Sequence, residues 1–161
     1  MFLFIFLLVF VSVIWLITYL NNQNRKKQWS SVADTLGSRV IAQLERVKCE
    51  TFYSGAKNGG QNFTHCHLYL TDDALVIFGY SKVLMIKQLR VPLVLTRNSS
   101  FYAFVSPYSQ LIKPKKINLN SFNGDIYIEF EQPGLIRTNV EIRLKEISSD
   151  LKNRLEFLNT I

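Results

Sequence analysis

The apolar start of this chain limits its possible architectures more than any other feature. Residues 1–20 contain no charged side chain, and the basic residues Arg25, Lys26 and Lys27 follow shortly after them. An α-helix of this length extends about 30 Å, which matches the hydrocarbon core of a bilayer. The sequence therefore predicts that residues 1–20 form a helix that crosses a membrane once.

The apolar run differs from a cleavable signal peptide. A signal peptide has a basic beginning, an apolar stretch of about 7–15 residues and a small-x-small cleavage site. No basic residue precedes this run, and residues 18–22 contain no such site. Trp15 and Tyr19 lie toward the end of the run, where amphipathic rings favour the headgroup level. We therefore expect an uncleaved anchor.

The flanking charges predict the orientation of this anchor. Basic residues are enriched on the cytoplasmic side of membrane spans, and Arg25, Lys26 and Lys27 follow the span directly. The pattern predicts that the N-terminus lies outside and that residues 21–161 lie in the cytoplasm, with the inner membrane of a bacterium as the expected location. The alternative is that the three bases only stop transfer and do not set its direction.

The chain after the span is basic, and its charge is unevenly distributed. The formal net charge is +7, and every charged side chain follows residue 20. Residues 74–124 contain no acid and seven bases: Lys82, Lys87, Arg90, Arg97, Lys113, Lys115 and Lys116. Such a surface suits an anionic leaflet or nucleic acid, although ordinary solvation is the simpler alternative. We expect no nucleic-acid partner, because no binding motif accompanies the charge.

Periodicity predicts a connecting helix and then one β-rich domain. Apolar residues recur at helical spacing over residues 29–47, with Gly37 as a weak point. Residues 21–46 would therefore form a basic juxtamembrane segment and a connecting helix. Residues 47–161 are long enough to form one domain with its own core.

The first predicted hairpin has its turn at Asn58-Gly59, which is a strong signal for a two-residue turn. This turn would pair Val47 with Leu70 and Cys49 with Leu68. Side chains between these positions would then alternate between a core face and an outer face.

A second turn, at residues 72–73, would pair Leu70 with Leu75 and Leu68 with Ile77. Both turns direct Leu68 and Leu70 into the core. A slip of one residue in either hairpin would break this agreement, so the two signals together predict an antiparallel meander.

A third turn, at Asn123-Gly124, would pair Leu119 with Ile128 and Ile117 with Phe130. All four side chains would then point inward. The same alternation of apolar and polar residues therefore predicts a second hairpin near the end of the chain.

The last part of the chain predicts a strand followed by a helix. Apolar and charged residues alternate over residues 140–144, and Ser148 or Ser149 can cap the helix. The apolar face of that helix would carry Leu151, Leu155 and Leu158. Between the hairpins, strand-like runs occur at residues 83–86, 91–95 and 101–105, interrupted by prolines and polar residues.

This order of elements resembles the pleckstrin-homology-like domains, in particular the GRAM and bacterial pleckstrin-like families. The resemblance is carried by LYLTDDALVIF (68–78), RVPLVL (90–95), DIYIEF (125–130) and VEIRL (140–144). It implies an α+β fold in which an antiparallel β-barrel or sandwich of about seven strands ends in a C-terminal helix. Phosphoinositide-binding members carry several bases in the first hairpin, whereas this chain offers only Lys57 there.

No residue pattern in the chain indicates catalysis, a metal or a cofactor. In His65-Cys66-His67 the two histidines share one face of a strand and Cys66 points to the other, so they cannot converge on one ion. Glu50, expected opposite His67, would add only one more ligand. Cys66 and Cys49 are expected to be buried thiols in a reducing cytoplasm. We expect a protein that is not an enzyme.

The outer face of the first sheet is expected to be unusually apolar for a surface in water. By the registers above it would display Phe52, Phe63, His65, His67, Tyr69, Val76, Phe78 and Tyr80. Aromatic clusters of this kind favour protein interfaces. The alternative is that the helix over residues 29–47, or the segment 80–116, covers this face within the same chain.

These expectations lead to three functional hypotheses. The first is a non-catalytic, membrane-anchored adaptor that binds a protein partner in the cytoplasm through the aromatic residues. The second is a domain that senses anionic lipid headgroups. Its candidate contacts are Arg25, Lys26, Lys27, Lys113, Lys115 and Lys116. The third is an enzyme with an unfamiliar site.

Overall fold

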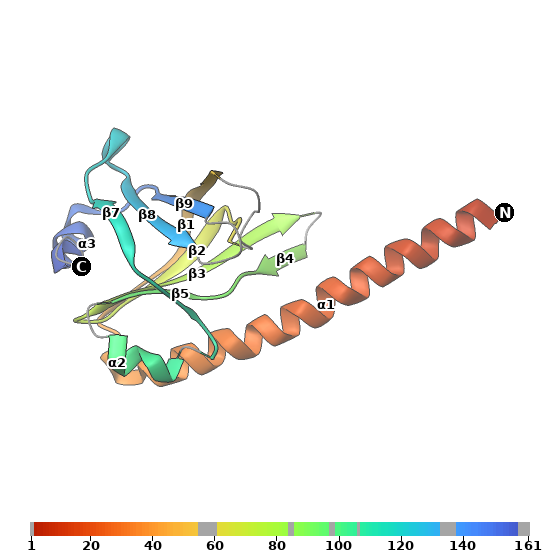
Figure 1. Cartoon of the computed structure of the whole chain (residues 1–161), viewed down its shortest axis with the longest axis horizontal. Coiled ribbons are helices and arrows are strands. Elements are labelled where there is room, and N and C mark those ends of the chain that lie inside the picture. Colours follow the sequence, from red (N-terminus) through yellow and green to blue (C-terminus); the bar gives the residue numbers. More distant parts are fainter. Residues whose placement is uncertain are drawn as a thin grey trace.

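A computed structural model describes residues 2–54, 61–83, 86–96, 99–105, 107–132 and 138–157 (Figure 1). The described helices are α1 (Phe2–Leu36), α2 (Ser99–Tyr102) and α3 (Ser149–Arg154), with short 3-10 turns η1 (Gly37–Arg39), η2 (Ala103–Val105) and η3 (Phe122–Gly124). The described strands are β1 (Ala42–Ser54), β2 (His65–Leu70), β3 (Ala74–Val83), β4 (Ile86–Leu89), β5 (Leu93–Thr96), β6 (Gln110–Ile112), β7 (Pro114–Asn118), β8 (Ile126–Gln132) and β9 (Thr138–Leu144).

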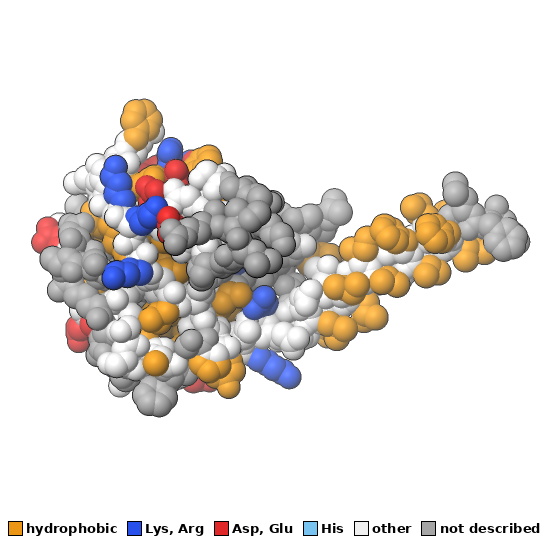
Figure 2. Space-filling model, in the orientation of Figure 1, with side chains coloured by type: hydrophobic (Ala, Val, Ile, Leu, Met, Phe, Trp, Pro, Cys, Tyr) orange, Lys and Arg blue, Asp and Glu red, His pale blue; other side chains and the backbone are white. Residues whose placement is uncertain are grey.

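Helix α1 has two parts with different surroundings. Its N-terminal half projects away from the β domain, whereas its C-terminal part runs along one face of the sheet (Figure 1). Exposed apolar side chains occupy nearly every position of the projecting half from Phe4 to Leu20, and Figure 2 shows those on one face. This helix is long and apolar enough to cross a membrane.

The helix predicted over residues 29–47 is wrong beyond Leu36. Helix α1 ends at Leu36, and Gly37 takes a left-handed backbone with a φ of 47°. Residues from Ala42 onward belong to β1, whose first half pairs with β2 and whose second half pairs with β9. Long-range pairing therefore outweighs the helical spacing of the apolar residues that follow Gly37.

The described strands form one sheet with the order β6-β5-β3-β2-β1-β9-β8-β7, and β4 pairs with β3. All pairs are antiparallel except β5 and β6, which are parallel. The long strand β1 belongs to both halves of the sheet, which is mostly antiparallel, barrel-like and nearly closed (Figure 1). The predicted α+β class is therefore confirmed, with more strands than the seven expected.

The predicted register of β2 and β3 is confirmed. Leu70 pairs with Leu75 and Leu68 pairs with Ile77, and all four side chains are buried in the core. The short turn leaves the two strands no freedom to slip without exposing this core face.

The predicted register of β1 and β2 is wrong. Val47 lies opposite Cys66 instead of Leu70, and Leu70 lies opposite Ala42. The register shifts between Leu44 and Val47, at an irregularity that contains Arg46 with a φ of 55°. Around Val47 the displacement is an even number of residues, so Val47 still faces the core as predicted. The predicted turn at residues 58–59 lies outside the described residues.

The predicted pairing of β7 with β8 is also displaced. Ile117 lies opposite Ile128 instead of Phe130. The connection is longer than a two-residue turn, because η3 lies within it and Asn123 has a φ of 59°. The two-residue turn predicted for this hairpin is therefore wrong.

Elsewhere the prediction is partly correct. Strand β5, residues 93–96, overlaps the predicted run 91–95, whereas the predicted strand over residues 101–105 is helical. Ser148 caps α3, because its Oγ accepts a hydrogen bond from the amide of Leu151 at 3.4 Å. Leu151 and Leu155 are buried as expected, and Leu158 lies outside the described residues.

Candidate functional site

The outer side of β2 and β3 carries the aromatic face, which we define as His65, His67, Tyr69, Phe78 and Tyr80. Alternation along the two strands places these five rings on one side of the sheet. The ring centroids of Tyr69 and Phe78 lie 4.9 Å apart, and those of His67 and Tyr80 lie 5.3 Å apart. The sequence therefore predicted this cluster correctly.

Phe52 and Phe63, the other two aromatic residues predicted on this face, lie elsewhere. Phe63 is only 1% exposed and packs in the core inside the barrel. Phe52 is 43% exposed, and the guanidinium of Arg143 on β9 lies 5.0 Å from its ring. The predicted partner surface is divided because β1 leaves β2 and pairs with β9 in this region.

The C-terminal part of α1 covers much of the aromatic face. Val32 and Leu36 are buried against this side of the sheet, and the indole of Trp29 lies 5.1 Å from the ring of Phe78. Tyr102 and Val105, from the segment 80–116, complete the same apolar cluster. Phe78 is consequently buried. Tyr80 is also buried, but it stacks on His65 and His67 and lies under Lys87. Cover by the same chain, the alternative raised by the sequence, therefore applies to much of this face.

Hydrogen bonds fix α1 to the edge of the sheet. The side-chain amide of Asn22 donates to the carbonyl of Lys87 at 2.6 Å and accepts from the amide of Leu89 at 3.0 Å. Seven residues later, the indole Nε1 of Trp29 donates to the carbonyl of Arg90 at 2.8 Å. The exposed backbone of β4 is thus paired with helix side chains, which blunts a sheet edge.

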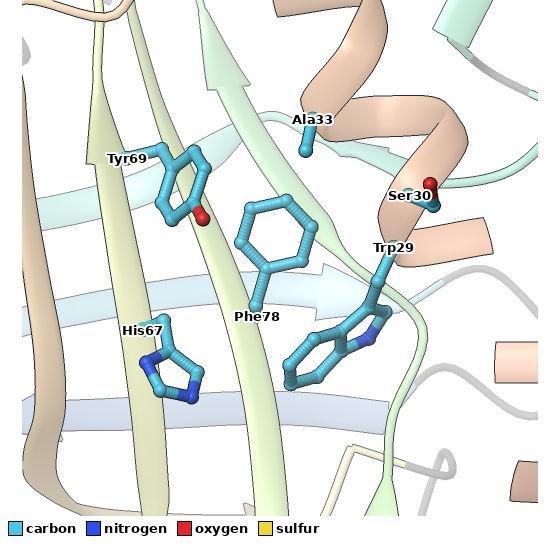
Figure 3. A pocket seen from close by; sticks show the side chains of 6 residues that line it. All are labelled: Trp29, Ser30, Ala33, His67, Tyr69 and Phe78. Carbon is cyan, nitrogen blue, oxygen red and sulfur yellow. The ribbon is translucent and has the colours of Figure 1, made fainter. Parts of the chain in front are cut away.

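A groove remains open between α1 and the sheet (Figure 3). Its volume is about 230 Å³ and its lining is mostly apolar. The lining residues are Trp29, Ser30 and Ala33 of α1, and His67, Tyr69 and Phe78 of the sheet. His67 and Tyr69, which line the groove, are half-buried, so this part of the aromatic face stays accessible from outside.

The side chain of Lys87 covers one end of the aromatic face. Its Nζ lies 3.9 Å from the centroid of Tyr80, 5.6 Å from that of Trp29, and 3.4 Å from Nε2 of His67. Partial burial lowers the pKa of Lys87, and the nearby cations Arg46 and Lys82 lower it further. Burial, followed by the charge of Lys87, also lowers the pKa of His67. His67 is therefore disfavoured as a cation.

A polar network surrounds Asp73, and no sequence pattern indicated it, because residues 72–73 were predicted only as a turn. The Asp73 carboxylate accepts hydrogen bonds at 3.0 Å from Thr71, from Tyr102 and from the guanidinium of Arg39. Burial would raise the pKa of Asp73, but these hydrogen bonds and the Arg39 charge outweigh it and lower the pKa. The network joins η1, the β2–β3 turn and α2.

The predicted lipid contacts fall into two separate groups. Arg25, Lys26 and Lys27 lie on α1, where basic side chains appear next to the apolar half of the helix (Figure 2). Lys115 and Lys116 lie on β7, with Lys113 just before it, and β7 ends the strand order opposite to the half that contacts α1. Lys115 also pairs with Glu131 at 2.6 Å. The six bases do not form one surface.

The His65-Cys66-His67 triplet has the predicted arrangement. Cys66 points into the core beside Cys49, both free thiols are buried, and the histidines point outward. The contact with Cys49, together with burial, raises the pKa of Cys66. In the strand register, Glu50 lies opposite Arg143 of β9, and not opposite His67 as predicted. Among the described residues, no three His, Cys, Asp or Glu side chains lie close enough to hold a metal ion.

Comparisons of the chain with protein-family models, with curated proteins and with solved structures gave no match. The relationship to pleckstrin-homology-like and GRAM-like domains therefore stays a prediction from the sequence.

Proposed function

We propose that this chain is a single-pass membrane protein whose β domain binds a protein partner at the cytoplasmic surface without catalysis. One observation carries the proposal: α1 runs without a break from an exposed apolar half to a half that packs on the sheet. A domain attached in this way is held in place beside the membrane, whereas a flexible linker would let it move freely.

The charges that follow the apolar half support a cytoplasmic location. Arg25, Lys26 and Lys27 begin five residues after Leu20, within the distance over which basic residues set orientation. On that side we expect Cys49 and Cys66, which are both buried, to stay reduced.

The groove beside Trp29 supports a protein partner. An apolar, aromatic-lined groove that stays open after the helix has packed is a surface of the kind that protein interfaces use. A lipid sensor has less support, because the bases on α1 and those near β7 are on different parts of the domain.

The positions of the candidate nucleophiles support a role without catalysis. A reactive cysteine needs a lowered pKa and access to a substrate, whereas Cys66 is buried with a raised pKa. The outward-facing His65 and His67 cannot act as its base, because they lie on the other side of the sheet.

Membrane extraction tests the anchor and its orientation. The full chain should stay in the membrane through an alkaline carbonate wash, and protease added outside sealed cells should leave residues 21–161 intact. Release of the protein by carbonate would exclude an anchor. Digestion in sealed cells would place the domain on the other side.

Cross-linking from the groove tests the partner. A photoreactive amino acid at Ser30 should give a cross-linked product in native membranes, and Ala33→Arg should remove it by filling the groove. Arginine has nearly the helix propensity of alanine, so α1 should be retained. Phe122→Arg, at a residue that is 79% exposed on η3, is the matched control. A product that survives Ala33→Arg would exclude the groove.

A further inference from the structure

The size of the groove beside Trp29 indicates what can enter it. The groove lies between α1 and the sheet, and the side chains of both elements point into it (Figure 3). Its volume of about 230 Å³ is smaller than the ~300–1,000 Å³ of a typical small-molecule pocket. A space of this size suits one apolar side chain of another protein better than a whole cofactor.

Hydrogen bonds within the chain already engage three polar groups of the lining. The indole Nε1 of Trp29 donates to a backbone carbonyl at the sheet edge, and Oγ of Ser30 donates to the carboxylate of Asp34 at 3.2 Å. The hydroxyl of Tyr69 accepts from the side-chain amide of Gln43 at 3.0 Å. A polar occupant would have to compete with these hydrogen bonds, whereas an apolar side chain would not.

A cation stands at one end of the groove. The Nζ of Lys87 lies 3.4 Å from Nε2 of His67 and 5.6 Å from the ring centroid of Trp29, and both of these residues line the groove. The side chain of Lys87 is exposed, and none of the ion pairs among the described residues includes it. An anion that arrives with a partner can therefore approach Lys87 from solvent.

The neighbouring charges make this end of the groove positive. Burial, followed by the cations Arg46 and Lys82, lowers the pKa of Lys87, and the acid Glu45 opposes them more weakly. Asp34, the one acid of α1, lies five residues beyond Trp29 in the direction away from Lys87. The two ends of the groove therefore differ in charge, and a carboxylate is attracted to the Lys87 end.

We propose that the groove binds an apolar side chain of the partner protein, and that an acidic residue beside it in the partner pairs with Lys87. The charge of the chain supports an acidic partner, because the net charge is +7 and residues 74–124 contain no acid. Opposite charges across an interface speed encounter and exclude wrong partners. This inference rests on the proposed function, and it adds the chemistry of the segment that occupies the groove.

Binding of short peptides to the full chain tests this chemistry. The chain has two tryptophans, so a Trp15→Phe background leaves the emission of Trp29 as a report from the groove. The protein is held in nanodiscs of phosphatidylcholine, whose headgroups carry no net charge. The probes are three capped peptides, Gly-Asp-Leu-Asp-Gly, Gly-Lys-Leu-Lys-Gly and Gly-Asp-Ala-Asp-Gly.

The first peptide should change the emission of Trp29 in a saturable way, and the other two should bind at least about tenfold more weakly. Lys87→Glu should reverse the preference between the acidic and the basic peptide. Lys87→Gln should abolish that preference, and it keeps most of the side chain if the reversed charge disturbs the packing on Tyr80. Lys113→Glu, at an exposed base just before β7, is the matched control and should leave the preference unchanged.

Equal binding of the acidic and basic peptides, or equal losses with Lys87→Glu and Lys113→Glu, would overturn the acidic partner and leave the groove as a docking site. If no peptide changes the emission of Trp29, this inference is wrong, while the cross-link from Ser30 decides separately whether a protein occupies the groove. Quenching of Trp29 by brominated acyl chains would assign the groove to lipid and overturn both proposals for it.

Discussion

The ring of Phe63 lies on the backbone of Gly79, so that a methyl group on Gly79 would come within 2.5 Å of Cδ1 of that ring. Gly79 pairs with Cys66 in the middle of β3, and Phe63 precedes β2. The backbone of Gly79 is not left-handed. Space, and not backbone conformation, is therefore the reason for a glycine here.

This contact predicts the effect of Gly79→Ala. The added methyl group must displace a buried ring, which should lower the free energy of unfolding by about 1–3 kcal/mol. Thermal unfolding of the full chain in detergent checks the change. In a Phe63→Leu background, Gly79→Ala should cause a smaller loss of unfolding free energy, because the smaller side chain leaves room for the added methyl group. Equal costs in the two backgrounds would show that the ring is not the obstacle.

The packing of α1 on the sheet predicts the effect of Leu36→Ala. Leu36 is buried against the aromatic face, so its truncation should cost about 2–5 kcal/mol in the free energy of unfolding. Thr35→Ala, at an exposed neighbour on the same helix turn, should change stability by about 0.5 kcal/mol or less. Chemical denaturation of both variants provides the measurement. Similar stabilities of Leu36→Ala and Thr35→Ala would mean that the packing of α1 does not stabilise the domain.

The Asp73 network predicts a dependence of stability on pH. The pKa of Asp73 is lowered on folding. The Asp73 carboxylate therefore contributes fully to the free energy of unfolding above its unfolded pKa of about 3.9, and this contribution is lost as the pH falls through the folded pKa. Asp73→Asn should therefore cost about 1–3 kcal/mol at pH 7, through the lost charged hydrogen bonds. The difference in the free energy of unfolding between Asp73→Asn and the parent should be smaller at pH 3 than at pH 7.

The neighbouring residue provides the control for this prediction. Asp72 is exposed in the same turn, so Asp72→Asn should leave the unfolding curve nearly unchanged at both pH values. A difference between Asp73→Asn and the parent that is the same at pH 7 and pH 3 would argue against a titrating carboxylate in the network.

The sequence predicted contacts that short turns determine and missed those that depend on distant pairing. The pairing of Leu68 with Ile77 follows from a tight turn and a shared core face. The partner of Val47 depends on where a long strand bends and where its register shifts, and nearby residues do not encode either. The core side of Val47 was still correct, because an even displacement preserves the face.

The candidate site was predictable to a similar degree. Alternation identified His67, Tyr69 and Phe78 as neighbours, because these residues lie on adjacent strands joined by a short turn. The cover by Trp29 and the hydrogen bonds of Asn22 depend on the angle at which α1 meets the sheet. That angle results from packing between segments more than 60 residues apart.

Gly37 sets the end of α1, and its backbone predicts the last result. Its φ is 47° and no atom lies within 4 Å of an added Cβ, so a substitution there meets only conformational strain. Gly37→Ala should lower the free energy of unfolding by about 1 kcal/mol, and Gly37→Asn should cost less, because asparagine tolerates this conformation better. Far-UV circular dichroism should show no added helix, since residues 42–44 stay paired with β2. A gain of helix with Gly37→Ala would mean that the helical spacing of the residues after Gly37 can compete with that pairing.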